Sequence, residues 1–145
     1  MSNQFVVLLV EDSPADIRLT REALAGGHLL HELRVLPDGA QALAFLRREA
    51  PFVDAPRPDM VLLDLNLPGR SGLEVLAEIK ADPGLARIPV IILSGSDAQM
   101  DISMAYDSFA NGYITKPVDL DQFIQALKTV EEFWFTFVKL PPGNE

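Results

Sequence analysis

The sequence predicts an α/β protein whose parallel sheet lies between two layers of helices. Short apolar runs rich in Val, Ile and Leu alternate along the chain with segments whose apolar residues recur at helical spacing. Charged or hydroxyl residues directly follow most of these runs, as expected where parallel strands end at one edge of a sheet. Because right-handed crossovers place helices on the faces of such a sheet, the alternation favours this layered arrangement.

The first two strand and helix units occupy the amino-terminal part of the chain. Residues 5–10 form a continuous apolar run, typical of a strand covered on both faces, and Pro14 suits the first turn of the helix that follows. The glycine pair 26–27 can end this helix. Residues 32–36 predict a weaker second strand, which leads through the turn 37–39 into a second helix.

A third unit follows after a loop. Residues 51–58 contain several prolines and predict an exposed excursion, after which residues 60–63 return to strand character. Ser71 and Glu74 have the spacing of a capping box, in which each side chain can bind a free amide of the first helical turn. The Asp-Pro-Gly turn at 82–84 should end that helix.

The last two units repeat the pattern. Residues 88–93 predict the fourth strand, and the dipeptide 111–112 should end the helix that follows it. One face of that helix carries Ile102, Ala105, Tyr106 and Phe109. Residues 113–115 predict a short fifth strand, and a final helix begins near Asp119.

Composition and charge indicate one soluble domain. With 145 residues and 48% apolar content, the chain can bury a single core of respectable size. A net charge of −9 opposes a nucleic-acid surface and favours a cation or a basic protein patch as partner. The chain has no cysteine, no apolar run long enough to span a membrane and no recognisable signal peptide, so we expect a cytoplasmic protein. We assign residues 1–130 to the domain and residues 131–145 to an extension of its last helix.

Chemically matched groups stand where four of the predicted strands end. These residues are Glu11, Asp12, Asp64, Ser94 and Lys116. Each could by itself be an ordinary surface or turn residue, but together they predict one site, because parallel strands end at a common edge. Mg²⁺ prefers oxygen ligands and keeps several waters. We expect Asp12 and Asp64 to bind it directly, Asn66 to bind through its backbone carbonyl, and Glu11 to act through water.

Phosphoryl transfer is a chemistry that such a site permits. Asp64 is the candidate nucleophile, and its attack on a phosphoryl group would form an acyl phosphate. Phosphoryl transfer needs charge compensation more than acid–base chemistry, and Lys116 and the cation would supply it. The Ser94 hydroxyl could donate a hydrogen bond to the phosphoryl group.

The order of these residues, with Pro117 directly after Lys116, resembles the receiver domain of two-component response regulators. The resemblance extends from about residue 5 to residue 127. It implies a flavodoxin-like, doubly wound sheet of strand order 2-1-3-4-5. It also implies that Asp64 accepts a phosphoryl group from a histidine kinase, with Mg²⁺ or Mn²⁺ as cofactor.

The same resemblance implies a conformational switch. Ser94 corresponds to the switch hydroxyl, and Tyr113 corresponds to the aromatic residue whose ring moves inward when that hydroxyl turns toward the phosphoryl group. This movement changes the surface made by helix 4, strand 5 and helix 5. In the family the bond between Lys116 and Pro117 is typically cis, and Asn66 and Ser96 occupy the positions that tune access of water to the phosphoryl group.

Finer details resemble the single-domain regulators that are paired with cyanobacterial and bacterial phytochromes. The shared features are the segment 65–69 after the acceptor, the proline-containing loop before the third strand, the segment 111–117, and the aromatic ending at 133–141. This resemblance implies that the phosphodonor is a light-regulated histidine kinase, a bacteriophytochrome.

The aromatic ending predicts an interface. A helix that ran from residue 119 to residue 138 would be about 30 Å long, which exceeds the length that the sheet beside it requires. Phe133, Trp134 and Phe137 then exceed what one core face can cover, and exposed aromatic clusters often mark protein interfaces. We expect a homodimer built on helix 4, strand 5 and helix 5. The alternative is a tail that folds back over its own domain.

We therefore expect a stand-alone receiver that signals to an unknown downstream protein or passes its phosphoryl group onward, and that is not a turnover enzyme. One alternative is a small magnesium-dependent phosphohydrolase with an Asp nucleophile, of the haloacid dehalogenase type. That type uses a second Asp two residues after the first, where this chain has Asn66. Another alternative is a phosphate-independent interaction module, which would have no need for the cation site. A flavin carrier is disfavoured, because the turn 11–14 is acidic where a phosphate-binding loop offers free amides.

Overall fold

The computed structural model describes residues 5–25, 31–95, 110–116, 121 and 125. A single parallel sheet runs through these residues, with the strand order β2-β1-β3-β4-β5. Its strands are β1 (Phe5–Val10), β2 (His31–Leu36), β3 (Met60–Asp64), β4 (Val90–Ser94) and β5 (Gly112–Thr115). The predicted flavodoxin-like sheet and its order 2-1-3-4-5 are confirmed.

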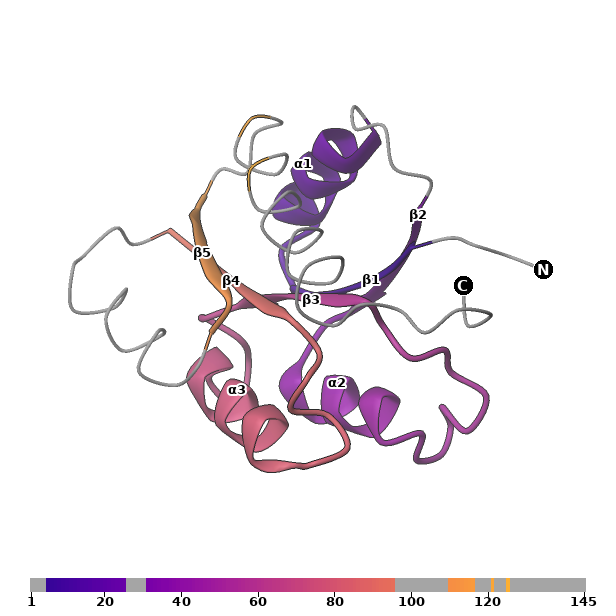
Figure 1. The fold of residues 1–145 in the computed structure, drawn as a ribbon. Coiled ribbons are helices and arrows are strands. Elements are labelled where there is room, and N and C mark those ends of the chain that lie inside the picture. The colour runs from indigo at the N-terminus through magenta and orange to yellow at the C-terminus, as the bar shows by residue number, and fades with distance from the viewer. Residues whose placement is uncertain (1–4, 26–30, 96–109, 117–120, 122–124, 126–145) are drawn as a thin grey trace.

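The described helices cover both faces of the sheet. Helix α1 (Pro14–Ala25) lies on one face, and α2 (Gly39–Leu46) and α3 (Gly72–Ala81) lie on the other (Figure 1). This is the layered arrangement that right-handed crossovers produce. Neighbouring strands of the sheet all pair in parallel, so their carboxyl ends point to one edge of the sheet.

Two apolar layers hold the helices against the sheet. Along β3, Leu62 packs in the layer beneath α1, while Leu63 packs in the layer shared with α2 and α3. Both side chains have 0% exposure, as expected for alternating residues of a strand that is covered on both faces. The continuous apolar run of each central strand is explained by this double burial.

Side-chain caps fix the first residues of α2 and α3, the two helices that share one face of the sheet. Asp38 caps α2, because its Oδ1 accepts a hydrogen bond from the Gln41 amide at 2.8 Å. At α3 the Ser71 Oγ accepts from the Glu74 amide at 3.2 Å, and the Glu74 carboxylate accepts from the Ser71 amide at 2.8 Å. The predicted capping box is therefore confirmed.

Two predictions need correction. The fourth strand begins at Val90 rather than Ile88, since Pro89 has no N–H to donate to a neighbouring strand. The excursion 51–58 is only partly exposed, because the rings of Phe45 and Phe52 meet edge to face with centroids 5.5 Å apart. Ala55 in the same loop is buried.

The predicted fourth helix, the final helix with its extension 131–145, and the division of the chain at residue 130 involve residues outside the described ranges. Within those ranges, the structure has no helix that is long and apolar enough to cross a membrane.

Candidate phosphoryl-acceptor site

The sheet brings the predicted site residues to one edge. Glu11 directly follows β1, Asp64 ends β3, Ser94 ends β4 and Lys116 follows β5. Backbone hydrogen bonds to neighbouring strands fix the positions of Glu11 and Lys116 along the sheet. The Glu11 amide donates to the Leu36 carbonyl at 3.0 Å, and the Lys116 amide donates to the Ser94 carbonyl at 2.7 Å. The side chains therefore converge because parallel strands in register end together.

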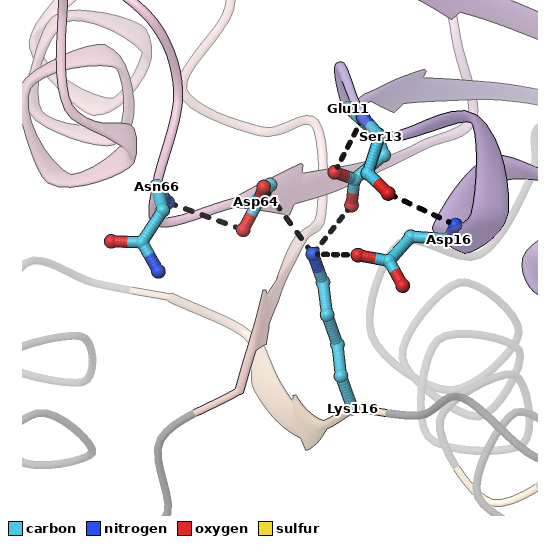
Figure 2. Close-up of polar contacts among 6 residues, drawn as sticks. All are labelled: Glu11, Ser13, Asp16, Asp64, Asn66 and Lys116. Atoms are coloured by element: carbon cyan, nitrogen blue, oxygen red, sulfur yellow. Dashed lines mark hydrogen bonds and ion pairs between the residues drawn. The ribbon is translucent and has the colours of Figure 1, made fainter.

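Lys116 lies at the centre of the site. Its Nζ is 2.7 Å from Glu11 Oε1, 2.9 Å from Asp16 Oδ2 and 3.3 Å from Asp64 Oδ2 (Figure 2). The ammonium group thus contacts three carboxylates that come from two different parts of the chain. One positive charge cannot neutralise three negative charges, so the site keeps an excess of negative charge that favours a further cation.

Burial sharpens the electrostatics of the site. Glu11 is 1% exposed and Asp64 is 3% exposed. Burial raises the pKa of Glu11 to about 7, against the lowering effect of Lys116, and the negative charge of Asp64 adds to the rise. Burial alone would lower the pKa of Lys116, but the contacts with Glu11, Asp16 and Asp64 outweigh it and raise that pKa above its usual value.

The backbone after β3 orients the Asp64 carboxylate. The amide of Asn66 donates to Asp64 Oδ1 at 3.2 Å, and the amide of Leu65 donates to the Leu93 carbonyl at 3.0 Å. Oδ2 is the oxygen that contacts Lys116. The two oxygens of this carboxylate therefore have different partners, and its plane is fixed by both.

The acidic residues suit a hard divalent cation. Carboxylate oxygens of Glu11, Asp12 and Asp64 lie within 4.8 Å of one another. Asp12 is exposed, whereas the other two side chains are buried. Glu11 Oε1 is buried, and apart from its 2.7 Å ion pair with Lys116 it has no hydrogen-bond partner among the described residues. A buried oxygen of this kind and two neighbouring carboxylates fit the oxygen ligation that Mg²⁺ and Mn²⁺ prefer.

The remaining predicted residues fall into two groups. Ser94 is buried at the end of β4, and Tyr113 on β5 packs partly buried against the layer shared with α2 and α3. Pro117, Ser96 and the aromatic residues of the carboxyl-terminal segment lie outside the described ranges.

Two residues of the site were missed in the sequence. Asp16 lies in the first turn of α1 and contacts Lys116. The backbone amide of Ser13 donates to Glu11 Oε2 at 3.3 Å, while its Oγ accepts from the Asp16 amide at 3.3 Å (Figure 2). The spacing from the acidic pair through Pro14 into a first helical turn could have indicated that Asp16 faces the same edge of the sheet.

Known proteins are similar to this chain in sequence and in fold. Response regulator Rcp1 of Synechocystis sp. (strain ATCC 27184 / PCC 6803 / Kazusa) is 46% identical over 136 residues, which cover 94% of this chain and 92% of that protein. The crystal structure of the phosphorylated cyanobacterial phytochrome response regulator RcpA matches with a TM-score of 0.78 and 51% identity, covering 95% of this chain and 99% of that one. The Mn²⁺-bound form of Rcp1 matches with a TM-score of 0.76 and 45% identity, covering 94% and 99% of the two chains.

The family assignment rests on the length of the match as well as on these relatives. The model of the response regulator receiver domain matches residues 7–128. This range contains β2, β3, β4, β5 and most of β1, together with the described residues that converge on Lys116. The chain therefore belongs to the response regulator receiver family and is a homologue of response regulator Rcp1 and of the cyanobacterial phytochrome response regulator RcpA.

Proposed function

We propose that Asp64 accepts a phosphoryl group from a histidine kinase and that the chain works as a phosphorylation switch. The observation that carries this proposal is the Asp64 carboxylate itself, which is 3% exposed, lies 3.3 Å from the Lys116 ammonium and stands beside two further carboxylates. The family supplies the phosphoryl donor, since receivers pair with histidine kinases.

In the proposed reaction, an oxygen of Asp64 attacks the phosphorus of a phosphohistidine. An O–P bond forms, the P–N bond breaks, and the imidazole keeps the electron pair and takes up a proton. Because the Asn66 amide holds Oδ1 and Lys116 lies beside Oδ2, the carboxylate need not reorient before it attacks. Lys116 then faces the negative charge that develops on the phosphoryl oxygens.

Ion pairs hold the positive charge of Lys116 at a fixed place in the site. Its Nζ is held by Glu11 and Asp64, so the ammonium group stays at the site while the phosphoryl group arrives, although Asp16 shares the same positive charge. We propose that the Ser94 hydroxyl, at the end of the next strand, donates a hydrogen bond to the phosphoryl group.

We propose Mg²⁺ as the resident cation, with Mn²⁺ able to replace it. Asp12 and Asp64 would hold it directly, with Glu11 acting through water and Asn66 through its backbone carbonyl. When bound, the cation supplies positive charge opposite the phosphoryl oxygens. The supporting observations are the carboxylate cluster of this chain and the Mn²⁺-bound form of its relative Rcp1.

Incubation with acetyl phosphate and Mg²⁺, followed by intact-mass spectrometry, tests the acceptor. We expect one phosphoryl adduct on the wild-type chain and on Asp59→Asn, and no adduct on Asp64→Asn. Asp59 is a matched control, because it is a half-buried carboxylate just before the opposite end of the same strand. An adduct of equal yield on Asp64→Asn would overturn the assignment.

The same incubation separates the other classes of function. Rapid turnover of many phosphoesters without a lasting adduct would indicate a phosphohydrolase, and the absence of both adduct and turnover would indicate a phosphate-independent interaction module. We favour the switch over turnover because Asn66 stands where a hydrolase of this chemistry uses a second carboxylic acid.

We propose that the output is a surface change driven by Ser94 and Tyr113. Ser94 is buried at the edge of the sheet where Asp64 lies. Tyr113 is on the neighbouring strand β5, two residues before Thr115. Ser94 pairs in register with Thr115, so the two switch residues lie on adjacent strands. In Ser94→Ala we expect phosphorylation to persist and the response of Tyr113 to phosphorylation, followed by NMR, to be lost.

We propose a bacteriophytochrome as the kinase, since the relatives RcpA and Rcp1 match almost the full chain and RcpA is described as a phytochrome response regulator. A phosphotransfer profile against purified histidine kinases tests this pairing. Fastest transfer from a phytochrome kinase is the expected result, and preference for an unrelated kinase would contradict it.

We also propose that residues 131–145 extend the domain 1–130 into a homodimer interface that includes Phe133, Trp134 and Phe137. The support is the aromatic composition of this segment. Sedimentation of the wild type and of a Trp134→Ala, Phe137→Ala double variant tests it. We expect the wild type to be a dimer and the double variant to dimerise more weakly. If both proteins are monomers, the proposal is wrong. The downstream partner, a protein, and the cytoplasmic location stay predictions.

A further inference from the structure

A second polar hollow lies at the opposite end of the sheet. Its volume is about 390 Å³, and it is lined by Leu46, Arg47, Arg48, Arg57, Asp82, Gly84 and Leu85. The loop after α2 leads into the amino end of β3, and the loop after α3 leads into the amino end of β4. The hollow, which we name the arginine hollow, is therefore separated from Asp64 by the length of the strands.

Three guanidinium groups gather there on a chain whose net charge is −9. Within the described residues, Arg48 and Arg57 form no ion pair with a carboxylate. Burial raises the pKa of Asp59, against the lowering effects of the hydrogen bond from the Val6 amide and of the nearby charge of Arg57, which forms no ion pair with it. The hollow is thus a local cluster of positive charge on a protein whose overall charge is negative.

Backbone anchors hold these two side chains in place. The Nε of Arg48 donates to the Ala55 carbonyl at 3.0 Å, and an Nη of Arg57 donates to the Gly84 carbonyl at 2.8 Å. An arginine has five N–H donors, so each anchor leaves four for another acceptor. Arg48 also has a backbone φ of 55°, a left-handed conformation that costs energy for a residue with a Cβ. Anchored guanidiniums lose less freedom when they bind a ligand.

Among the described residues, the one carboxylate that lines the arginine hollow, that of Asp82, already has partners. Asp82 Oδ2 lies 3.6 Å from Arg47 Nε, and its Oδ1 accepts from the Gly84 amide at 2.9 Å. Arg47 is also 3.4 Å from the Glu78 carboxylate, so the charge of Arg47 is largely compensated by Asp82 and Glu78. Arg48 and Arg57 therefore determine what the hollow attracts, and Asp82 does not oppose them.

We propose that the arginine hollow binds a small organic phosphate of about the size of a nucleoside diphosphate. Guanidinium groups match phosphate oxygens in paired hydrogen bonds, which favours phosphate over a single carboxylate. The volume of about 390 Å³ falls within the range of small-molecule pockets. Leu46 and Leu85 also line the hollow and, at 8% and 5% exposure, offer a small apolar contact to the organic part of the ligand. This inference is independent of phosphorylation at Asp64.

Amide NMR of the full chain, titrated with ADP in buffer that contains EDTA, tests the proposal. EDTA removes divalent cations, so that the acidic site does not attract the phosphate. We expect shifts confined to residues 46–58 and 82–85, with a dissociation constant below about 1 mM. Adenosine and pyrophosphate should each bind at least tenfold more weakly than ADP. No shifts, or equal binding of adenosine or pyrophosphate, would overturn the proposal.

Three charge-matched variants complete the test. Arg48→Gln and Arg57→Gln should each weaken ADP binding at least tenfold, while Arg87→Gln should change it less than twofold. Arg87 is exposed in the same loop as Leu85 but does not line the hollow. The amide spectrum of each free variant reports whether its fold is intact. Equal weakening in all three variants would show attraction by overall charge and would contradict a built site.

Discussion

Asp16 competes with Asp64 for the same ammonium group. It lies 2.9 Å from Lys116 Nζ, closer than the 3.3 Å between Asp64 Oδ2 and that atom. A cation that is shared with a third carboxylate is less available to the phosphoryl group. Asp16 therefore belongs to the site as a residue that positions Lys116, although it is not expected to touch the phosphoryl group itself.

Replacement of Asp16 should make phosphorylation faster. Asp16→Asn keeps the shape of the side chain but removes its charge, so Lys116 turns more fully to Asp64. A partly exposed ion pair contributes about 1 kcal/mol, which corresponds to about a fivefold higher initial rate with acetyl phosphate. Glu22→Gln, on an exposed position of the same helix, should leave the rate unchanged. An unchanged or slower rate in Asp16→Asn would show that Asp16 does not restrain Lys116.

The buried Glu11 makes stability depend on pH. Burial raises its pKa from 4.5 to about 7 in the folded chain, so between these values the folded state binds more protons than the unfolded state. The free energy of unfolding that Glu11 contributes is therefore highest below pH 4.5 and falls as the pH rises to about 7.

Urea unfolding in EDTA, compared between the wild type and Glu11→Gln, measures this contribution. Glutamine has the same shape and does not titrate. The wild type should lose stability relative to Glu11→Gln as the pH rises from about 4.5 to about 7, with no further relative change up to about pH 9. A constant difference across this range would mean that the folded pKa of Glu11 is ordinary.

At the scale of elements, the start of α3 controls the place of the acceptor. The Gly72 amide donates to the Leu65 carbonyl at 2.9 Å, which closes the loop that follows Asp64. A Cβ on Gly72 would lie 2.3 Å from the Asp64 carbonyl oxygen and 2.7 Å from Leu65 Cα. Both contacts are to backbone atoms, which cannot rotate away, so glycine is required here for close approach.

Gly72→Ala should therefore damage both stability and phosphorylation. Overpacking against backbone costs about 1–3 kcal/mol, and the displaced Asp64 should lose at least tenfold in its rate with acetyl phosphate. Gly84→Ala is the control, because its Cβ would meet only Asp82 Oδ1, at 3.3 Å. We expect Gly84→Ala to lower the free energy of unfolding by less than about 1 kcal/mol and to be phosphorylated by acetyl phosphate at the wild-type rate. Equal behaviour of the two variants in urea unfolding and intact-mass assays would refute the role of Gly72.

At the scale of the whole molecule, one central strand joins two apolar layers. Leu62 and Leu63 have 0% exposure and belong to different layers. The strands on either side of β3 pair with it directly, so a loss of packing in one layer is transmitted to the other through the same backbone. The described parts of the chain should therefore unfold together.

Leu62→Ala and Leu63→Ala test this coupling. Each should lower the free energy of unfolding by about 2–5 kcal/mol, and each should leave a single transition that far-ultraviolet circular dichroism and amide NMR report at the same urea concentration. Leu19→Ala, at a position on α1 that is 39% exposed, should change stability by less than about 0.5 kcal/mol. Two separate transitions in either buried variant would contradict a common core.

The sequence alone determined the order of the strands and of the described helices along the chain, and the edge of the sheet at which the site lies. Apolar runs such as residues 5–10 and 60–63 could be assigned to strands because burial on both faces requires continuous apolar residues. Asp64 and Lys116 could be assigned to one site because parallel strands end at one edge of a sheet. The capping box at Ser71 and Glu74 was equally local, since it depends on residues three apart.

Tertiary structure decided everything that depends on distance between segments. The contact of Asp16 with Lys116 joins residues that are 100 positions apart, and no local pattern encodes such a distance. The burial that raises the pKa of Glu11 arises from the strands around it, and the arginine hollow forms only where the loops after α2 and α3 meet. Periodicity and strand ends are properties of a segment, whereas burial, ion pairing and hollows are properties of the packed molecule.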